Sequence, residues 1–307
     1  MGIVMKQSEV FVYQKRLPLR ERILDEICLA RLQDLNGSGH RVRGQRFAVY
    51  ANDWIGHNVN LYGVYEKELL DSTFGFLQML NLDFSSHMVL DIGANIGNHC
   101  VYFSKLFKRV LAFEPNRSAY DLLRFNTQSC SNVELYNFGL GDFDGLASLF
   151  EDLENVGGSS IKYFDPSRQT PVPVQIKKLD FLDCDLSALI LVKIDVEGFE
   201  SSVIKGGLET FCRHRPIILI EQNRRDFPSK GGESEAITLL RDLGYCFFVN
   251  QPEFRSENWL SRRIRNLKEM FKGSVYRREI TFAAKIPVSN YEMLIAVPDI
   301  MVPSFAL

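Results

Sequence analysis

The sequence lacks the features that mark a membrane protein or a nucleic-acid binder. Its 36 basic and 38 acidic side chains leave a formal charge of −2, without the basic excess of most proteins that bind DNA or RNA. No apolar run approaches the roughly 18 to 20 residues of a membrane span, and residues 1–20 hold no continuous apolar stretch of the signal-peptide kind. We therefore expect a cytoplasmic protein with no nucleic-acid partner, and we do not expect membrane contact.

Cysteine is sparse and scattered, which argues against a zinc site. The six cysteines lie far apart, with no C-x-x-C pair and no cluster of cysteine and histidine. We interpret them as reduced residues of the core or of helices. At 307 residues and 46% hydrophobic content, the chain can bury a sizeable core, as one large domain or as a domain with extensions. Nothing in this composition indicates an oligomeric state.

Short, fully apolar runs separated by helical segments begin at residue 88, and this pattern is typical of buried parallel strands joined by crossover helices. It predicts an α/β fold with an open, doubly wound, Rossmann-like sheet of seven strands, mostly parallel with the last strand antiparallel. In such sheets the ligand crevice lies at the carboxyl ends of the strands. The predicted strands cover 88–93, 109–115, 133–142, 189–198, 216–223, 245–251 and 290–298.

The remainder of the chain flanks or interrupts this pattern. Residues 1–85 contain two helical stretches and predict a helical lead-in that caps a main domain at 86–307. Between the third and fourth strands we expect a long loop, followed by an extended edge element that ends at Leu179 and Asp180.

A basic segment at about 251–288 is predicted to be a helical insertion. Within it, residues 259–272 place apolar side chains at helical spacing beside arginine and lysine, which predicts a basic amphipathic helix. Such a helix packs as a cap on its own domain, closes over an acceptor as a lid, or lies on an anionic membrane surface. A cap on its own domain is the commonest case, and the sequence does not decide among the three.

The turn after the first predicted strand, VLDIGANIGNH (residues 89–99), carries the clearest chemical signal. Gly93 and Gly97 allow a ligand to approach the backbone closely, and the helix that follows offers unpaired N–H groups. A dinucleotide site would need the pattern G-x-G-x-x-G, which Asn95 breaks, and Asp91 opposes an anionic ligand. A tight strand-to-helix turn without a ligand is the alternative.

Acidic residues at the ends of the next two strands favour an adenosine ligand without phosphates. Glu114 ends the second strand, where a carboxylate can accept hydrogen bonds from both hydroxyls of a ribose. Asp142 follows the third strand, where it would reach the adenine amino group, and Asn95 and Asn116 are candidates for backbone or amide contacts. With Asp91, these carboxylates suit a cationic sulfonium and ammonium better than a pyrophosphate. The ligand that fits is S-adenosylmethionine.

At these residues the sequence resembles the FkbM-type methyltransferases, a branch of the class I S-adenosylmethionine-dependent fold. The blocks VLDIGANIGNH, AFEPN, GLGD, IDVEGFE and VIKGG stand in the order expected for that family, over about residues 50–298. The resemblance implies a class I methyltransferase domain at 86–307 and S-adenosylmethionine as the cofactor. It also implies a hydroxyl of a sugar or glycoconjugate as the acceptor, and contact between Glu66, in the lead-in GVYEKE, and the methionine end of the cofactor.

The block KIDVEGFE supplies candidates for catalysis at the end of the fourth predicted strand. Transfer to a hydroxyl benefits from a base that takes its proton, and we expect Asp195 or Glu197 to be that base, with the other positioning the acceptor. Lys193 lies on the same side of the strand as Asp195 and is expected to pair with it or orient it. We predict no metal, although Asp195 and Glu221 could hold Mg²⁺ if the reaction depends on it.

Two other polar residues near these turns have plainer interpretations. Glu200 is expected at the start of a helix, where acidic side chains are favourable. His99 follows the glycine turn and could lie near the cofactor, but we interpret it as a helix-surface histidine.

The sequence therefore predicts an S-adenosylmethionine-dependent O-methyltransferase that acts on a small-molecule or glycan acceptor by in-line transfer. A methyltransferase for a polyketide-like or other small metabolite is one alternative. A non-catalytic binding protein that keeps the methyltransferase fold is another, because a fold does not guarantee a function.

Overall fold

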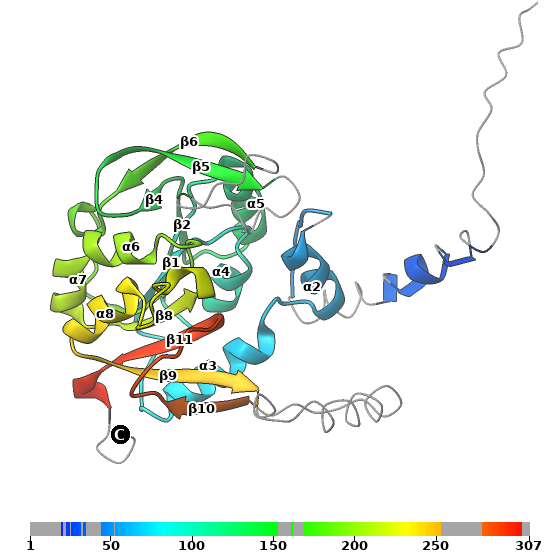
Figure 1. Cartoon of the computed structure of the whole chain (residues 1–307). Coiled ribbons are helices and arrows are strands. Elements are labelled where there is room, and N and C mark those ends of the chain that lie inside the picture. Colours follow the sequence, from blue (N-terminus) through cyan, green and yellow to red (C-terminus); the bar gives the residue numbers. More distant parts are fainter. Residues whose placement is uncertain are drawn as a thin grey trace, which may run out of the picture.

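The computed structural model describes residues 20, 23–24, 26–31, 33–34, 44–51, 53–152, 161, 169–252 and 278–302. Its core is one large sheet with helices on both faces, accompanied by a smaller sheet (Figure 1). None of the helices in this part of the chain is long and apolar enough to cross a membrane.

The large sheet has eight strands in the order β10-β9-β11-β8-β7-β1-β2-β3. Strands β3, β2, β1, β7 and β8 are parallel neighbours, whereas β11 runs antiparallel to β8 and β9, and β10 runs antiparallel to β9. The predicted doubly wound, mostly parallel sheet is confirmed. The strands are β1 (Met88–Ile92), β2 (Arg109–Phe113), β3 (Val133–Tyr136), β7 (Leu189–Ile194), β8 (Ile217–Gln222), β9 (Tyr245–Pro252), β10 (Arg278–Phe282) and β11 (Tyr291–Pro298).

The sheet has one strand more than the seven predicted. All seven are present, although the third, predicted at 133–142, ends at Tyr136 and its remainder contributes β4 to a second sheet. The additional strand, β10, lies inside the segment at 251–288 that the sequence predicts to be a helical insertion. Strand β10 is half-exposed at the sheet edge, so its sequence REITF lacks the continuous buried apolar run that marks β1. Residues 253–277, which include the predicted basic helix at 259–272, lie outside the described residues.

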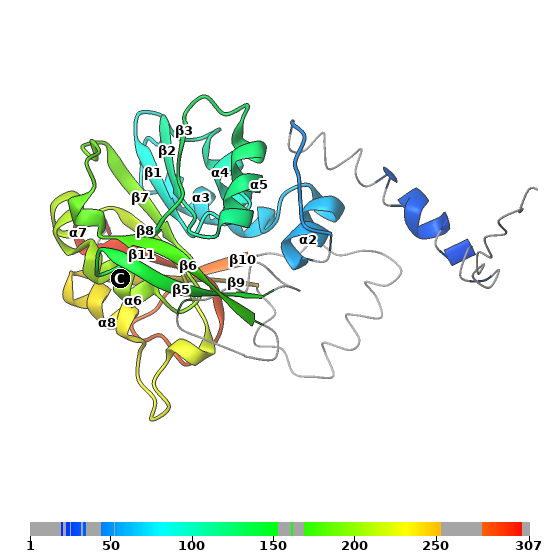
Figure 2. The same cartoon turned by 90° about the horizontal axis from the view of Figure 1, so that it is seen from above.

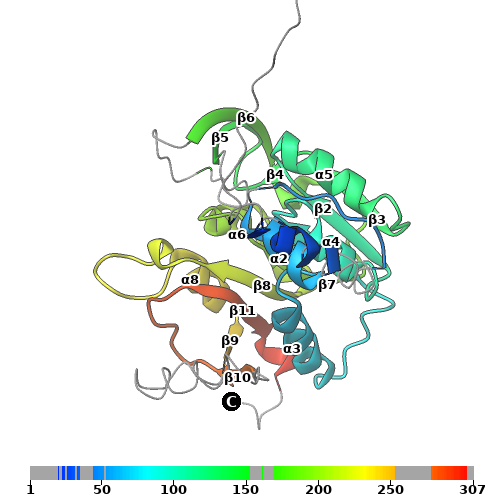
Figure 3. The ribbon, with the colours of Figure 1, turned by 90° about the vertical axis from the view of Figure 1, so that its right-hand side faces the viewer.

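Alternating side chains of the central strands form two apolar clusters, one on each face of the sheet. In β1, Leu90 and Ile92 belong to one cluster and Val89 to the other. This double cover is why the central strands are almost wholly apolar, and it leaves their carboxyl ends as the place for polar groups. Figures 2 and 3 show the helices on the two sides. The first face carries α6 (Glu200–Gly206), α7 (Leu208–His214) and α8 (Glu235–Asp242), and the second carries α3 (Lys67–Gln78), α4 (Asn98–Phe103) and α5 (Arg117–Thr127).

The predicted boundary near residue 85 falls between elements that share one cluster. Leu70 and Phe74 of α3 pack in the same cluster as Val89 of β1 and Phe103 of α4. The lead-in also contributes α2 (Trp54–Tyr62). The lead-in therefore covers part of the sheet, and its treatment as a unit separate from the main domain stays a prediction.

A second sheet, in the order β4-β6-β5, interrupts the chain between β3 and β7 (Figure 1). It consists of β4 (Gly139–Leu140), β5 (Gly145–Asp152) and β6 (Gln169–Lys177). Strands β5 and β6 pair antiparallel along the whole of β5. The extended element predicted before Leu179 is therefore β6, and β5 is a partner strand that the sequence analysis did not predict.

Candidate active site

The carboxyl ends of β1, β2, β7 and β8 open into a pocket of about 240 Å³. This is the place that the topology of a doubly wound sheet predicts for a ligand. The predicted site residues that line it are Glu66, Gly93, Asn95, Glu114, Asn116, Lys193, Asp195, Glu197 and Glu221.

The turn after β1 presents backbone, rather than a bulky side chain, to the pocket. Gly93 has a φ of +80°, and a Cβ atom there would lie 1.7 Å from the backbone oxygen of Asp195. That distance is far inside van der Waals contact, and the left-handed φ disfavours any side chain, so only glycine fits. Asn95 also has a left-handed φ, of 49°, and its N–H donates to Glu114.

Glu114, directly after β2, is held by backbone N–H groups at both carboxylate oxygens. Oε2 accepts the N–H of Asn95 at 2.7 Å, and Oε1 accepts the N–H of Asn116 at 2.8 Å. Burial raises the pKa of Glu114 to about 7, although these two hydrogen bonds favour the ionised form. Because each oxygen keeps a further lone pair, a diol in the pocket can donate to both. Asn116 in turn caps α5, accepting the N–H of Ser118 at 2.9 Å.

A buried lysine links the two central strands beneath the pocket. Lys193 of β7 is the register partner of Asp91 in β1, and its Nζ atom lies 3.6 Å from Asp91 Oδ1 and 3.0 Å from Asp195 Oδ2. Burial opposes the charge of Lys193, but Asp195 and Asp91 outweigh it and raise its pKa above the ordinary value. Cys100 donates from Sγ to Asp91 at 3.0 Å. Asp91 is completely buried and supports the site from below.

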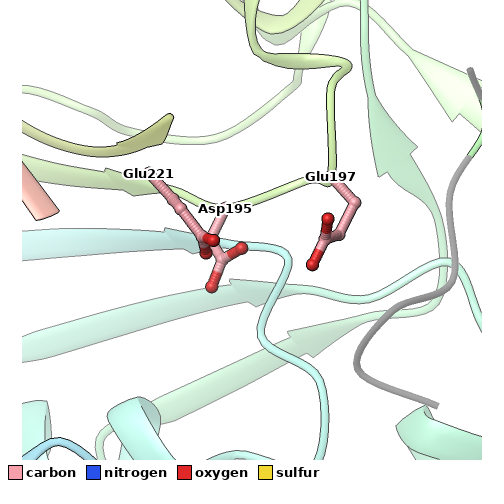
Figure 4. A group of neighbouring side chains, drawn as sticks. All are labelled: Asp195, Glu197 and Glu221. Atoms are coloured by element: carbon pink, nitrogen blue, oxygen red, sulfur yellow. The ribbon is translucent and has the colours of Figure 1, made fainter. Parts of the chain in front are cut away.

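Three carboxylates converge at the ends of β7 and β8 (Figure 4). One oxygen atom from each of Asp195, Glu197 and Glu221 lies within 4.8 Å of the other two, and Asp195 and Glu221 point toward one another. Burial, and then the charge of Asp195, raise the pKa of Glu221 well above its ordinary value. Burial opposes the charge of Asp195 as well, but Lys193 outweighs it and lowers the pKa. Within this pair, the negative charge is favoured on Asp195 over Glu221.

Glu197 lies on the far side of the same cluster and has a left-handed φ of 51°. Its Oε2 atom pairs with Arg225 and lies 3.4 Å from Asn223 Nδ2, which also reaches Glu221 at 3.3 Å. Burial raises the pKa of Glu197 to about 7, with Asp195 adding to the shift and Arg225 opposing it. Oxygen ligands of this kind suit a divalent cation, but each carboxylate of the cluster already has a nitrogen partner in the protein.

Glu200 closes the turn after β7 at the start of a helix, as predicted. Only 3% of the residue is exposed, and Oε1 accepts the N–H of Gly198 at 2.9 Å. Burial raises its pKa to about 7. Glu200 is the first residue of α6 and supports the shape of the turn that carries Asp195.

Tyr65 and His99, which are not among the predicted site residues, also line the pocket. The interpretation of His99 as a helix-surface residue is wrong, because it is 7% exposed and its Nε2 atom lies 3.2 Å from Glu66 Oε2. The signal available in the sequence was its place two residues after Gly97, at the pocket end of α4. Tyr65 had no signal except its position beside Glu66.

Three predicted cofactor residues do not line the pocket. Asp142 is exposed and is not among the residues that line the pocket, although Gly139 and Leu140 of β4, just before it, do line it. Gly97 lies against α5, where a Cβ atom would meet a side-chain carbon of Leu123 at 2.7 Å, so its role is helix packing. Asp91 lies beneath Lys193, as described above.

Residues 91–247, about half of the chain, match the family described as the methyltransferase FkbM domain. The chain belongs to the FkbM methyltransferase family. The resemblance seen in the sequence is thereby confirmed, and the protein is a methyltransferase. The family match includes Gly93, Glu114, Asp195 and Glu221, whereas Glu66 precedes it.

Three curated relatives of this FkbM methyltransferase are themselves named as methyltransferases. Methyltransferase 1 of Beauveria bassiana is 25% identical, over 68% of this chain and 89% of its own. Methyltransferase sdnD of Sordaria araneosa is 25% identical, over 57% of this chain and 80% of its own. The 2-O-methyltransferase NoeI of Sinorhizobium fredii is 28% identical, over 42% of this chain and 61% of its own. A solved FkbM methyltransferase from Methylobacillus flagellatus aligns with a TM-score of 0.33 at 18% identity, over 67% of this chain and 60% of that one.

Proposed function

We propose that this FkbM methyltransferase transfers a methyl group from S-adenosylmethionine to a hydroxyl oxygen of a sugar or glycoconjugate. The observation that carries the proposal is the position of Asp195 in the pocket at the strand ends, where it pairs with Lys193 at 3.0 Å and faces Glu221. The name of the relative that is a 2-O-methyltransferase supports oxygen as the acceptor atom. The sugar class follows from the family resemblance of the sequence.

The polar groups of the pocket suit S-adenosylmethionine better than a cofactor that carries phosphates. Glu114 offers two oxygens to a ribose diol, and Glu66 and Asp195 offer negative charge to an ammonium and a sulfonium group. The same carboxylates would repel a pyrophosphate. When bound, S-adenosylmethionine supplies the electrophilic methyl group.

The surroundings of Asp195 favour removal of a proton from an acceptor hydroxyl. A hydroxyl oxygen that becomes a methyl ether must lose its proton, and an ionised carboxylate within hydrogen-bond reach can accept it. Lys193 lowers the pKa of Asp195 whereas burial raises the pKa of Glu221, which supports Asp195 as the base of this pair. Glu197 lies on the same turn and lines the pocket, and we propose that it positions the acceptor.

The proposed reaction needs no metal, because Lys193 already supplies positive charge to the carboxylate cluster. Activity should therefore persist in the presence of EDTA. Loss of activity in EDTA that added Mg²⁺ restores would instead assign Asp195, Glu197 and Glu221 to a metal site.

Calorimetric titration with S-adenosylmethionine and S-adenosylhomocysteine, with NAD as the control, tests the cofactor. We expect binding in the roughly micromolar range by the wild-type chain, no binding of NAD, and loss of binding in Gly93→Arg. A panel of neutral oligosaccharides with cofactor labelled in the methyl group then tests the acceptor. Absence of cofactor binding by a correctly folded wild-type chain would contradict the proposal.

A further inference from the structure

His99 is the second residue of α4, and its imidazole reaches the carboxylate of a distant loop inside the pocket. Its Nε2 atom lies 3.2 Å from Glu66 Oε2, and only 7% of the residue is exposed. The ring packs against Phe103, one turn further along the helix, with ring centroids 6.0 Å apart and planes at 24°. The imidazole is therefore fixed in place with one nitrogen beside Glu66.

The backbone next to Glu66 is held by the preceding residue of the same helix. Asn98 Oδ1 accepts the N–H of Tyr65 at 2.9 Å, and Asn98 Nδ2 donates to the Tyr65 carbonyl at 3.0 Å. Glu66 follows with a left-handed φ of 59°. Asn98 thus holds the backbone of this loop by two hydrogen bonds. The adjacent His99 places its buried Nε2 atom, which has no hydrogen-bond partner among the described residues, within ion-pair distance of the Glu66 carboxylate.

The part of the pocket around Glu66 favours a positive charge. Burial, and then the charges of Glu66 and Asp195, raise the pKa of the Tyr65 hydroxyl above its ordinary value, because the three groups lie close together. Among the described residues that line the pocket, Lys193 is the only lysine or arginine, and it is already paired with Asp195. An ammonium group is a cation that the proposed cofactor would bring to this place.

We propose that His99 is a positioning residue, which holds the Glu66 carboxylate so that Glu66 binds the ammonium group of S-adenosylmethionine. The inference rests on the proposed function. The role requires an N–H donor at position 99, whereas a purely structural role requires only a ring packed against Phe103. His99→Gln keeps a donor and loses the ring, and His99→Phe keeps a ring and loses the donor.

Calorimetric titration of the full chain with two ligands tests the inference. S-adenosylhomocysteine carries the ammonium group, and 5′-methylthioadenosine lacks the amino-acid portion. We expect His99→Phe to weaken binding of S-adenosylhomocysteine by about tenfold or more, as Glu66→Gln does, with binding of 5′-methylthioadenosine changed by less than about threefold. His99→Gln should retain most of the affinity.

Two further variants complete the design. The double variant His99→Phe/Glu66→Gln should bind S-adenosylhomocysteine no more weakly than Glu66→Gln alone, since both changes remove the same interaction. His57→Gln, at an exposed histidine of α2, is the matched control and should bind like the wild type.

Three outcomes would overturn the inference. The first is unchanged affinity for S-adenosylhomocysteine in His99→Phe. The second is a loss of affinity for S-adenosylhomocysteine in His99→Gln as large as the loss in His99→Phe. The third is a loss of affinity for 5′-methylthioadenosine in His99→Phe as large as that for S-adenosylhomocysteine, which indicates a general disturbance of the pocket. If His99→Phe does not fold, as judged by circular dichroism, His99→Leu removes the donor in its place. Failure of the wild-type chain to bind S-adenosylhomocysteine counts against the proposed function itself, so the two failures are distinguishable.

Discussion

The turns after β1 and β7 lie beside one another at the base of the pocket, yet they contribute different chemistry. Both contain left-handed residues, among them Gly93 in the first turn and Glu197 and Gly198 in the second. The first turn presents backbone, because a side chain at Gly93 would strike the oxygen of Asp195. The second turn carries the carboxylates. The turn that carries the carboxylates therefore depends on a neighbouring turn that has no side chain at the point of contact.

The two aspartates that share Lys193 show the same division. The side chain of Asp91 is 0% exposed and that of Asp195 is 29% exposed. Both are carboxylates beside one cation, but only Asp195 lines the pocket. The accessibility of a carboxylate, rather than its residue type, thus separates the supporting aspartate from the candidate base.

Removal of the shared cation should have the largest effect on stability. Lys193→Met leaves Asp91 and Asp195 without their buried partner, and we expect the free energy of unfolding at pH 7 to fall by about 3 to 5 kcal/mol. Urea unfolding measures this loss. The double variant Lys193→Met/Asp91→Asn should recover part of it, since one buried charge is then removed. A fall in the free energy of unfolding of less than about 1 kcal/mol in Lys193→Met would show that burial of Asp91 and Asp195 does not depend on the lysine.

Filling the space between the turns after β1 and β7 with a side chain should have the next largest effect on stability. Gly93→Ala places a carbon 1.7 Å from Asp195 O at a left-handed φ, and we expect a loss of about 2 to 4 kcal/mol in stability and at least about tenfold in affinity for S-adenosylhomocysteine. Thermal melting and calorimetry measure the two effects. Gly75→Ala is the control, because Gly75 lies within α3 and a Cβ atom there meets nothing within 4 Å. Wild-type behaviour of Gly93→Ala would contradict the described contact.

The sequence predicted the parts of this site that follow from strand order alone. Gly93, Glu114 and Asp195 each stand just past a buried strand, and parallel strands bring their carboxyl ends to one edge. The burial of His99 could not be predicted in this way, because it depends on a loop that Asn98 holds across 33 residues of sequence. Asp142 was predicted to lie at the pocket because residues 133–142 resemble one continuous strand, whereas β3 ends at Tyr136 and β4 begins at Gly139. Strand β10 was missed because edge strands lack a continuous apolar run.

The pH dependence of stability tests the role of Glu200, the buried carboxylate that supports the turn after β7. Burial raises the pKa of Glu200 from 4.5 to about 7, so the folded chain holds a proton that the unfolded chain releases between these values. This contribution to stability is complete below pH 4.5 and is lost as the pH rises through about 7. Glu200→Gln does not titrate and keeps an oxygen for the N–H of Gly198.

We therefore expect the stability of Glu200→Gln relative to wild type to increase between pH 5 and pH 8, by up to about 3 kcal/mol. Chemical unfolding at several pH values measures the difference. A constant difference across this range would count against a raised pKa at Glu200.

Removal of the exposed ion pair between Arg225 and Glu197 should have the smallest effect on stability. The Arg225 side chain is 44% exposed where it meets Glu197, so solvent screens the pair. We expect Arg225→Ala to change the free energy of unfolding by less than about 1 kcal/mol, in contrast with Lys193→Met. A loss as large as that of Lys193→Met would show that burial does not set the difference between the two cations.

The rate of methyl transfer by Asp195→Asn, beside Asp91→Asn, tests the central claim most directly. The acceptor is one that the oligosaccharide panel identifies, and the rate is measured in a single turnover at saturating cofactor. The account predicts a fall of about 10²- to 10⁴-fold for Asp195→Asn with affinity for S-adenosylhomocysteine retained within about threefold, and a fall below about tenfold for Asp91→Asn. Transfer at the wild-type rate by Asp195→Asn would contradict the assignment of Asp195 as the base.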